Sequence, residues 1–212
     1  FKHRGMEVVG YDKTSSNLTE ALEREGIQVF FEDSATRINR EFDIVVYTPA
    51  IPKNSVLLNH FSASHPMMMK RSEVLGLITK EAFTIAVAGS HGKTTVCSMI
   101  AHVLKDTGYD CTAFLGGISK NFNSNFVSGN NDVVVVEADE YDRSFHRLNP
   151  NIAVITSVDS DHLDIYGSLE KIEEAFIEFT NKVDAEGTVF VQSQVKIIDR
   201  ISRKVKTYSA SA

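Results

Sequence analysis

The sequence has few cysteines, no long apolar run and no excess of positive charge. Its two cysteines, Cys97 and Cys111, are too few for a disulfide framework and lack the spacing of metal ligands, so both are expected to be reduced and packed. No apolar segment approaches the roughly 20 residues of a membrane-spanning helix, and the first residues lack the apolar core of a secretory signal. With 22 basic and 28 acidic residues the net charge is −6, which argues against a dedicated nucleic-acid binder. These absences favour a cytoplasmic enzyme.

The remaining composition is that of an ordinary globular chain. Apolar residues make up 42%, charged residues 24%, and there are four prolines, which excludes a disordered or low-complexity protein. The chain starts at Phe1 and almost at once enters a strand-like segment at 6–11. We therefore expect that an upstream part of the protein is missing from this sequence.

Strand-like and helix-like patterns alternate along the first 80 residues. The predicted strands are 6–11, 28–31 and 43–47, and the predicted helices are 18–25, 55–62 and 71–79. Asn17 is the candidate N-cap of the first helix. Such alternation is typical of a parallel sheet with helices on its faces. The pattern predicts an α/β domain over residues 1–80.

A second α/β domain is predicted over residues 81–212. Its predicted strands are 84–88, 132–137, 152–156, 188–191 and 205–208, and one predicted helix begins after Ser168. The four consecutive valines before Glu137 suggest a strand that is buried on both faces. Another helix is predicted by a core-facing apolar stripe at helical spacing, which consists of Val96, Met99, Ile100, Val103 and Leu104.

A glycine-rich turn between a predicted strand and a predicted helix has the features of a phosphate-binding loop. The turn consists of Gly89, Ser90, His91, Gly92, Lys93, Thr94 and Thr95. Backbone N–H groups of such a turn, together with the positive end of a helix, can point several donors at one phosphate, and a lysine adds a mobile positive charge. The Thr94 hydroxyl can bind a magnesium ion. These seven residues are the candidate nucleotide-binding residues, and Lys93 is also a candidate catalytic residue.

The loop departs from the general G-x-x-x-x-G-K-[ST] pattern at one position. That pattern places a glycine five residues before Gly92, where this chain has Val87, and the glycine follows at position 89. The alternative interpretation is a strand-to-helix turn that uses its glycines only for backbone geometry.

Acidic residues follow the predicted strand at 132–137, at the sheet edge where open α/β folds bind ligands. Mg²⁺ prefers hard oxygen ligands and keeps positions for phosphate and water, so one carboxylate and one hydroxyl suffice. Glu137, the last residue of the strand, is the best placed for metal binding and catalysis. Asp142 is better explained as a solvated loop charge.

His162 follows the next predicted strand, 152–156, and is expected at the same sheet edge. A neutral imidazole there could bind a second divalent ion or contact the γ-phosphate region, with Asp161 or Asp164 as its hydrogen-bond partner. A loop histidine can also be merely solvated. The expected place beside Glu137 favours His162 as a metal ligand and catalytic residue.

Three segments together resemble the Mur ligases of bacterial peptidoglycan synthesis. The segments are the turn at 89–95, the Glu-Ala-Asp-Glu run at 137–140, and Asp161-His162 followed by Tyr166-Gly167. In this family the first glycine of the loop stands three residues before the Gly-Lys pair, which accounts for the valine at position 87. His91 and the acidic run narrow the resemblance to members that act on UDP-N-acetylmuramate, and the segment 149–167 looks more like those that add L-alanine.

The resemblance also implies a domain organisation, because family members have domains that bind a UDP-sugar, ATP and an amino acid. Residues 1–80 would form most of a Rossmann-like UDP-sugar-binding domain, with its start missing. Residues 81–212 would form part of a P-loop-type ATPase domain with a parallel sheet. The amino-acid domain would be absent, so the chain alone is not expected to ligate.

Three residues of the first domain are candidates for substrate binding. Asp12 follows the first predicted strand, where doubly wound folds place a ribose-binding acid. Thr48 and Arg71 are further candidates, and for these two a turn role and a surface charge are the open alternatives.

The implied reaction is ATP-dependent amide formation between UDP-N-acetylmuramate and L-alanine through an acyl phosphate, with Mg²⁺ or Mn²⁺. A carboxylate that approaches a triphosphate needs charge neutralisation, which Lys93 and metal ions at Thr94, Glu137 and His162 would supply. No nucleic-acid or membrane partner is expected. Two alternatives stay open: a muropeptide-recycling ligase that adds a tripeptide, and a P-loop module that binds nucleotide without ligation.

A switch GTPase of the second kind would carry an N-K-x-D segment that specifies the guanine base. This sequence occurs at 181–184, but there it is expected to end a helix.

Overall fold

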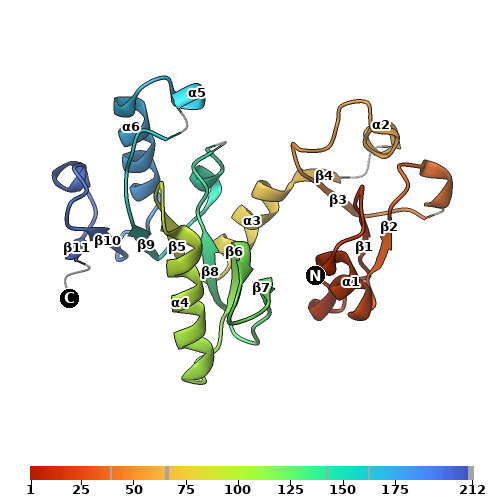
Figure 1. Ribbon diagram of the computed structural model, residues 1–212, viewed down its shortest axis with the longest axis horizontal. Helices are drawn as coiled ribbons and strands as arrows, with labels where there is room; N and C mark the ends of the chain where they lie inside the picture. Colours follow the sequence, from red (N-terminus) through yellow and green to blue (C-terminus); the bar gives the residue numbers. More distant parts are fainter. Residues whose placement is uncertain (39, 65–66, 142, 162, 210–212) are drawn as a thin grey trace. The chain divides into compact units, whose positions relative to one another are not determined.

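The computed structural model describes residues 1–38, 40–64, 67–141, 143–161 and 163–209 (Figure 1). The chain divides into two compact units, Phe1–Val74 and Leu75–Ala212, and each is described by itself. Within the described residues, no helix combines the length and the apolar character needed to cross a bilayer.

The first unit contains two parallel two-stranded sheets. β1 (Val9–Tyr11) pairs with β2 (Gln28–Phe30), and β3 (Ile44–Tyr47) pairs with β4 (Met67–Lys70). Because parallel strands need a crossover, helices connect them, and the helical elements are η1 (Lys2–Arg4), α1 (Asn17–Arg24), η2 (Ala35–Arg37) and α2 (Val56–Ser64). A further helix, α3 (Arg71–Lys80), begins in the first unit and ends in the second. The predicted α/β class is confirmed, but β4 was not predicted, because its three methionines carry no β-branched signal.

The start of α1 shows a capping box one residue earlier than predicted. The Ser16 hydroxyl accepts a hydrogen bond from the Thr19 N–H at 3.3 Å, and the Thr19 hydroxyl accepts one from the Ser16 N–H at 2.8 Å. This reciprocal pair satisfies donors at the helix start that would otherwise lack partners. The prediction of Asn17 as N-cap is therefore wrong.

The start of α2 is held by Asp33, which lies in the loop after β2. The carboxylate accepts hydrogen bonds from the Leu57 N–H at 2.8 Å, the Val56 N–H at 2.9 Å and the Ser55 hydroxyl at 3.0 Å. These bonds, the one from Leu57 most of all, lower the pKa of Asp33. One carboxylate thus ties a loop to a helix more than 20 positions away.

The second unit is built on one seven-stranded sheet with the order β11-β10-β9-β5-β8-β6-β7. The strands are β5 (Phe83–Ala88), β6 (Thr112–Ser119), β7 (Ser124–Val127), β8 (Val133–Glu137), β9 (Ile152–Ile155), β10 (Thr188–Gln192) and β11 (Val205–Tyr208). Every neighbouring pair is parallel except the antiparallel pair β6 and β7. The remaining elements are α4 (Lys93–Asp106), η3 (Ser144–Arg147), α5 (Leu163–Tyr166), α6 (Leu169–Thr180) and η4 (Ile198–Arg200).

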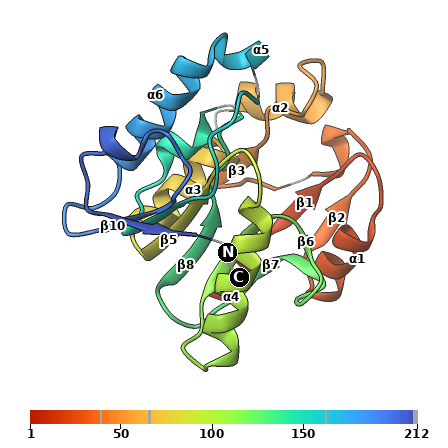
Figure 2. The ribbon, with the colours of Figure 1, turned by 60° about the vertical axis from the view of Figure 1, so that its left-hand side comes forward.

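Alternate side chains of the central strands face two separate cores, so the sheet is covered on both faces. Val133 and Val135 pack in the core that contains residues of α4, whereas Val134 and Val136 pack in the core that contains residues of α6. Figures 1 and 2 show these two helices on opposite faces of the sheet. The predicted burial of the valine run on both faces is confirmed, and each such side chain contributes about 1.5–3 kcal/mol by leaving water.

The buried face of α4 differs from the predicted stripe. Met99 and Val103 are 62% and 58% exposed, whereas Cys97 and Ala101 are fully buried against the sheet. Two small residues let the helix approach the sheet closely, which turns the larger side chains at 99 and 103 toward solvent. The prediction is therefore wrong for these two positions. Cys97 and Cys111 are both free and buried, as predicted, and burial raises the pKa of the Cys97 thiol.

Candidate functional site

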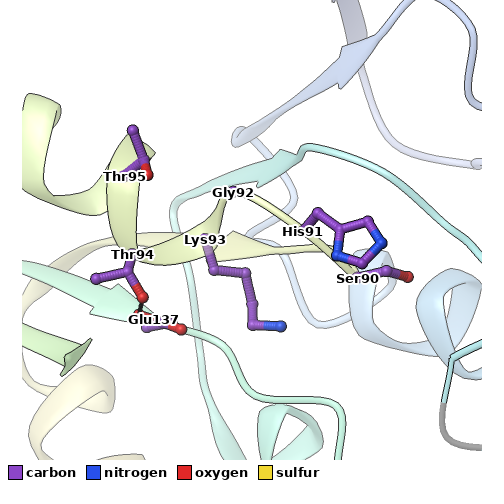
Figure 3. Close-up of a pocket in the computed structure, with 7 residues that line it drawn as sticks. All are labelled: Ser90, His91, Gly92, Lys93, Thr94, Thr95 and Glu137. Carbon is purple, nitrogen blue, oxygen red and sulfur yellow. Dashed lines mark hydrogen bonds between the residues drawn. The ribbon is translucent and has the colours of Figure 1, made fainter.

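The glycine-rich turn lies at the carboxyl end of β5, between the ends of β8 and β9 on either side in the sheet. An open pocket of about 320 Å³ is lined there by Ser90, His91, Gly92, Lys93, Thr94, Thr95 and Glu137. Figure 3 shows these side chains around the start of α4. The structure thus brings six of the seven predicted loop residues together with the predicted strand-end carboxylate.

Gly89 does not line the pocket but makes the turn possible. Its φ of 141° is rare for any other residue, and an added Cβ would lie 2.0 Å from the Thr156 hydroxyl and 2.8 Å from the Ser157 nitrogen. Val87, where the general loop pattern has glycine, is a fully buried residue of β5. The turn therefore begins two residues later than in the general pattern.

The end of β9 holds the loop in place. The Ser157 carbonyl oxygen accepts a hydrogen bond from the Ser90 N–H at 3.2 Å, and the Ser157 hydroxyl accepts one from the His91 N–H at 3.0 Å. The Ser90 hydroxyl in turn accepts from the Asp159 N–H at 2.9 Å. Two loop amides are thus bonded to the protein itself. Sequence reasoning missed Ser157, since a serine after a strand gives no distinctive signal.

Thr94 and Glu137 meet directly in the pocket. The Thr94 hydroxyl donates to Glu137 Oε2 at 2.7 Å, and the same oxygen accepts the Gly116 N–H at 2.8 Å. A Cβ on Gly116 would lie 2.6–2.7 Å from the Glu137 carboxylate, so with any other residue at this position the carboxylate would have to shift. The sequence analysis identified Thr94 and Glu137 but missed Gly116.

Lys93, the first residue of α4, is held by two acceptors. Its ammonium donates to the Gly89 carbonyl oxygen at 2.7 Å and to Glu140 Oε1 at 2.9 Å. The Lys93 side chain is 13% exposed and that of Glu140 only 3%. The sequence analysis placed Glu140 in the acidic run but gave it no role.

His91 is the most exposed titratable side chain of the loop, at 71%. Its Nε2 lies 3.4 Å from Asp161 Oδ2 and 3.8 Å from Asp159 Oδ2, so the segment after β9 reaches the loop. His162 and Asp142 lie outside the described residues, and their predicted roles stay predictions. Among the described residues no group of three His, Cys, Asp or Glu could hold a metal ion.

Comparison with known proteins places the chain in a family. The model named Mur ligase middle domain matches residues 87–212, and the model named Mur ligase family, catalytic domain, matches residues 1–82. The chain belongs to the Mur ligase family.

Relatives of this Mur ligase chain include curated proteins that carry one name. It is 47% identical over 217 residues to UDP-N-acetylmuramate--L-alanine ligase of Parabacteroides distasonis, a match that covers 100% of the chain and 47% of that protein. It is 47% identical over 203 residues to the protein of the same name from Christiangramia forsetii, a match that covers 93% of the chain and 45% of the relative. The chain spans about half the length of the curated relatives it matches.

Solved Mur ligase structures share the fold. The UDP-N-acetylmuramate-alanine ligase of Thermotoga maritima superposes with a TM-score of 0.83 at 28% identity, over 100% of this chain and 48% of that one. A UDP-N-acetylmuramate:L-alanyl-gamma-D-glutamyl-meso-diaminopimelate ligase from Neisseria meningitidis has a TM-score of 0.84 at 24% identity, covering 97% of this chain and 71% of that one. The second likeness concerns the fold alone.

The three substrate candidates of this Mur ligase chain follow strand ends of the first unit. Asp12 comes directly after β1 and accepts the Thr14 N–H at 3.1 Å. Thr48 follows β3 and Arg71 follows β4, and because Tyr47 pairs with Lys70, both lie at one edge of the same small sheet. The Thr48 carbonyl oxygen accepts the Ile51 N–H at 3.2 Å, as a turn residue would. The substrate roles of the three residues stay predictions.

The N-K-x-D sequence ends a helix, as predicted. α6 ends at Thr180, and Asn181 is its C-cap, with its N–H bonded to the Ile177 carbonyl oxygen at 3.1 Å. Lys182 continues the same turn, with its N–H bonded to the Phe179 carbonyl oxygen. These backbone bonds give the sequence a structural explanation that involves no guanine base.

Proposed function

We propose that this chain supplies the UDP-sugar-binding and ATP-binding domains of a cytoplasmic ligase that joins L-alanine to UDP-N-acetylmuramate. In this proposal residues 1–80 bind the UDP-sugar and residues 81–212 bind ATP. The observation that carries the proposal is that Lys93 and the hydrogen-bonded oxygens of Thr94 and Glu137 line one pocket at the loop. This arrangement occurs in a chain that is 47% identical to a protein named UDP-N-acetylmuramate--L-alanine ligase.

The pocket fits a magnesium ion that accompanies the nucleotide. Two ligands at neighbouring octahedral positions about 2.1 Å from Mg²⁺ lie about 3 Å apart. The Thr94 hydroxyl and Glu137 Oε2 are 2.7 Å apart, and both are hard oxygen ligands. Such an ion would neutralise phosphate charge and leave positions for phosphate oxygens and water. His162 is proposed as the ligand of a second ion.

The loop residues would bind the triphosphate. The N-terminus of α4 and the glycine-rich turn present backbone N–H groups, and Lys93 adds a positive charge beside them. In the proposed reaction the muramate carboxylate oxygen forms a bond to the γ-phosphorus while the bond to the β-phosphate oxygen breaks and ADP leaves. The alanine amine then forms the C–N bond, loses a proton and expels phosphate. Both steps need charge neutralisation more than proton transfer from the protein.

The sugar nucleotide is assigned to the strand ends of the first unit. Asp12 would bind the ribose hydroxyls, and Thr48 and Arg71, which lie at one edge of the β3–β4 sheet, would contact the phosphates or the sugar. An arginine beside a turn hydroxyl is suited to a diphosphate because its planar fork donates two parallel hydrogen bonds.

Phosphate release by the full-length protein tests the proposal. The assay contains UDP-N-acetylmuramate, ATP, Mg²⁺ and one amino acid at a time, with product mass confirmed by mass spectrometry. The expected result is release with L-alanine and far less with glycine or serine. Release only with L-alanyl-γ-D-glutamyl-diaminopimelate would instead show a recycling ligase, and preference for GTP without ligation would show a binding module. Omitting UDP-N-acetylmuramate is the control for unrelated ATPase activity.

A further inference from the structure

We infer that Glu140 is a positioning residue that holds the ammonium of Lys93 in the direction needed for phosphate transfer. The inference rests on the proposed function and deepens it, because it concerns how the same loop uses its lysine. Glu140 lies 2.9 Å from the Lys93 ammonium and is the partner of that ammonium in the structure, together with the Gly89 carbonyl oxygen.

The burial of the pair shows why the two groups stay together. The Glu140 side chain is 3% exposed and that of Lys93 is 13% exposed, so separating the two charges inside the protein would be unfavourable. Lys93 is therefore expected to keep its hydrogen bond to Glu140 when a phosphate binds. The ammonium then contacts the phosphate and Glu140 at the same time.

The donor count of lysine allows this arrangement. An ammonium has three N–H donors. Within the part of the chain that the structure describes, Lys93 donates to the Gly89 carbonyl oxygen and to Glu140, which leaves a third donor for a phosphate oxygen. Figure 3 shows the Lys93 ammonium turned away from Glu137. The lysine therefore does not occupy the position proposed for the metal ion at Glu137.

The backbone of Glu140 is itself fixed from two sides. Its carbonyl oxygen accepts the Tyr166 hydroxyl at 2.6 Å and the Arg143 N–H at 3.0 Å. Tyr166 is only 2% exposed, and the Arg143 guanidinium lies 5.1 Å from the centre of its ring. The carboxylate therefore stands on a rigid support, which is what a residue that directs a flexible lysine requires.

A negative charge beside the lysine also weakens ground-state attraction for ATP. Loss of Glu140 has two consequences: it removes an anion near the triphosphate, which favours binding, and it frees a long side chain, which disturbs the transfer geometry. The two effects separate in steady-state kinetics. Loss of a positioning residue lowers kcat and leaves KM for ATP unchanged or lower.

The test compares Glu140→Ala and Glu140→Gln with the unmodified full-length protein. We expect kcat to fall about tenfold or more in Glu140→Ala, with KM for ATP unchanged or reduced, and to fall less in Glu140→Gln, which keeps an oxygen acceptor. The matched control is Glu173→Gln, which removes a 2.7 Å ion pair to Arg200 elsewhere in the second unit and should leave both constants unchanged.

A second measurement does not depend on ligation. In the ¹⁵N-lysine-labelled protein, the Lys93 ammonium should give a signal protected from exchange, assigned by its loss in Lys93→Arg. The signal should disappear in Glu140→Ala and persist in Glu173→Gln. Its persistence in Glu140→Ala would overturn the inference.

The outcomes distinguish this inference from the proposed function. If the unmodified protein ligates and Glu140→Ala has a normal kcat, or has only a raised KM for ATP, the positioning role is wrong while the function stands. If the unmodified protein does not ligate but the Lys93 signal depends on Glu140, the function is wrong and the pairing stands.

Discussion

The two units of the chain differ in how firmly they support the residues proposed to act in them. In the second unit, a sheet covered on both faces carries the loop and Glu137 at its carboxyl edge. In the first unit, the described residues with a buried apolar side chain are Ile27, Val29, Leu57 and Val74, and each sheet has two strands. The comparison teaches that a rigid site comes from strand ends held by two cores, whereas the substrate candidates lie on a lightly packed frame.

The difference also appears in the local contacts of the proposed residues. Thr94, Glu137 and Lys93 are bonded to partners on other strands or loops of the second unit. The Asp12 carboxylate and the Thr48 carbonyl oxygen accept hydrogen bonds from residues two and three positions along the chain, and the Asp12 backbone N–H reaches further, to the Phe30 carbonyl oxygen of β2. The residues proposed to bind ATP are thus preorganised, and we expect the residues proposed to bind the sugar nucleotide to be ordered by the substrate itself.

The largest effect is expected from Lys93→Ala in the full-length protein. Loss of the charge beside the triphosphate should lower turnover about 10³-fold, and loss of the buried pair with Glu140 should lower the Tm while the protein stays folded at the assay temperature. The control is Lys105→Ala, which removes the ion pair to Asp110 at the far end of the same helix and should lower stability but not kcat. Phosphate release and thermal unfolding check both variants. Near-normal turnover of Lys93→Ala would remove the loop from the proposed site.

Core truncations should separate the two units by stability. Phe176→Ala, at a fully buried position of α6, should cost about 3–5 kcal/mol, whereas Leu57→Ala in the thinner core of the first unit should cost nearer 2 kcal/mol. Urea unfolding with hydrogen exchange followed for each unit measures both losses. Equal losses, or a larger loss for Leu57→Ala, would contradict the comparison.

Alanine substitutions at two neighbouring glycines of β6, Gly116 and Gly117, test whether this strand holds the Glu137 side chain in place. In Gly116→Ala the new methyl group would meet the Glu137 carboxylate at 2.6–2.7 Å, and because that is the end of a flexible side chain, the carboxylate should move while the fold persists. We expect turnover to fall about tenfold and the Mg²⁺ concentration that gives half-maximal activity to rise. In Gly117→Ala the nearest atom, Thr94 Cγ2, is 3.8 Å away, so kinetics should stay normal. Equal kinetics in both variants would show that Glu137 is not held by β6.

The smallest effect is a pH-dependent one in the first unit. Since the pKa of Asp33 is lowered in the folded protein, its contribution to stability is present above the unfolded pKa of about 3.9 and is lost as pH falls through the lower folded value. Asp33→Ala should therefore lower Tm at pH 7, and the difference from the unmodified protein should shrink below about pH 4. A difference that is constant between pH 7 and pH 3 would contradict the capping role.

The sequence was sufficient to predict those parts of the candidate site where a characteristic residue type stands at the end of a predicted strand. The loop at 89–95 can be proposed as a phosphate-binding loop because such binding restricts which residues can stand between a buried strand and a helix, and Glu137 can be proposed as a metal ligand because it ends a buried strand. Glu140 could not be separated from its acidic neighbours by sequence, because its role comes from a lysine 47 positions away. The domain roles of residues 1–80 and 81–212 and the part played by His162 remain predictions.

The fold was predictable to a similar degree and for related reasons. The valine run predicts a buried strand well, but the hairpin of β6 and β7 was missed, because β6 contains Gly116 and Gly117, which weaken the strand signal. Gly116 is there because Glu137 lies against it. The buried face of α4 was predicted wrongly because large apolar residues gave the sequence signal, whereas the small residues Cys97 and Ala101 form the buried face.

A crystal structure of the full-length protein with a non-hydrolysable ATP analogue and Mg²⁺ tests the central claim most directly. The account predicts phosphate oxygens within hydrogen-bond distance of the loop at 89–95, Lys93 in contact with both phosphate and Glu140, and the metal ion on Thr94 and Glu137. A triphosphate bound elsewhere, or a metal ion that contacts neither Thr94 nor Glu137, would contradict it.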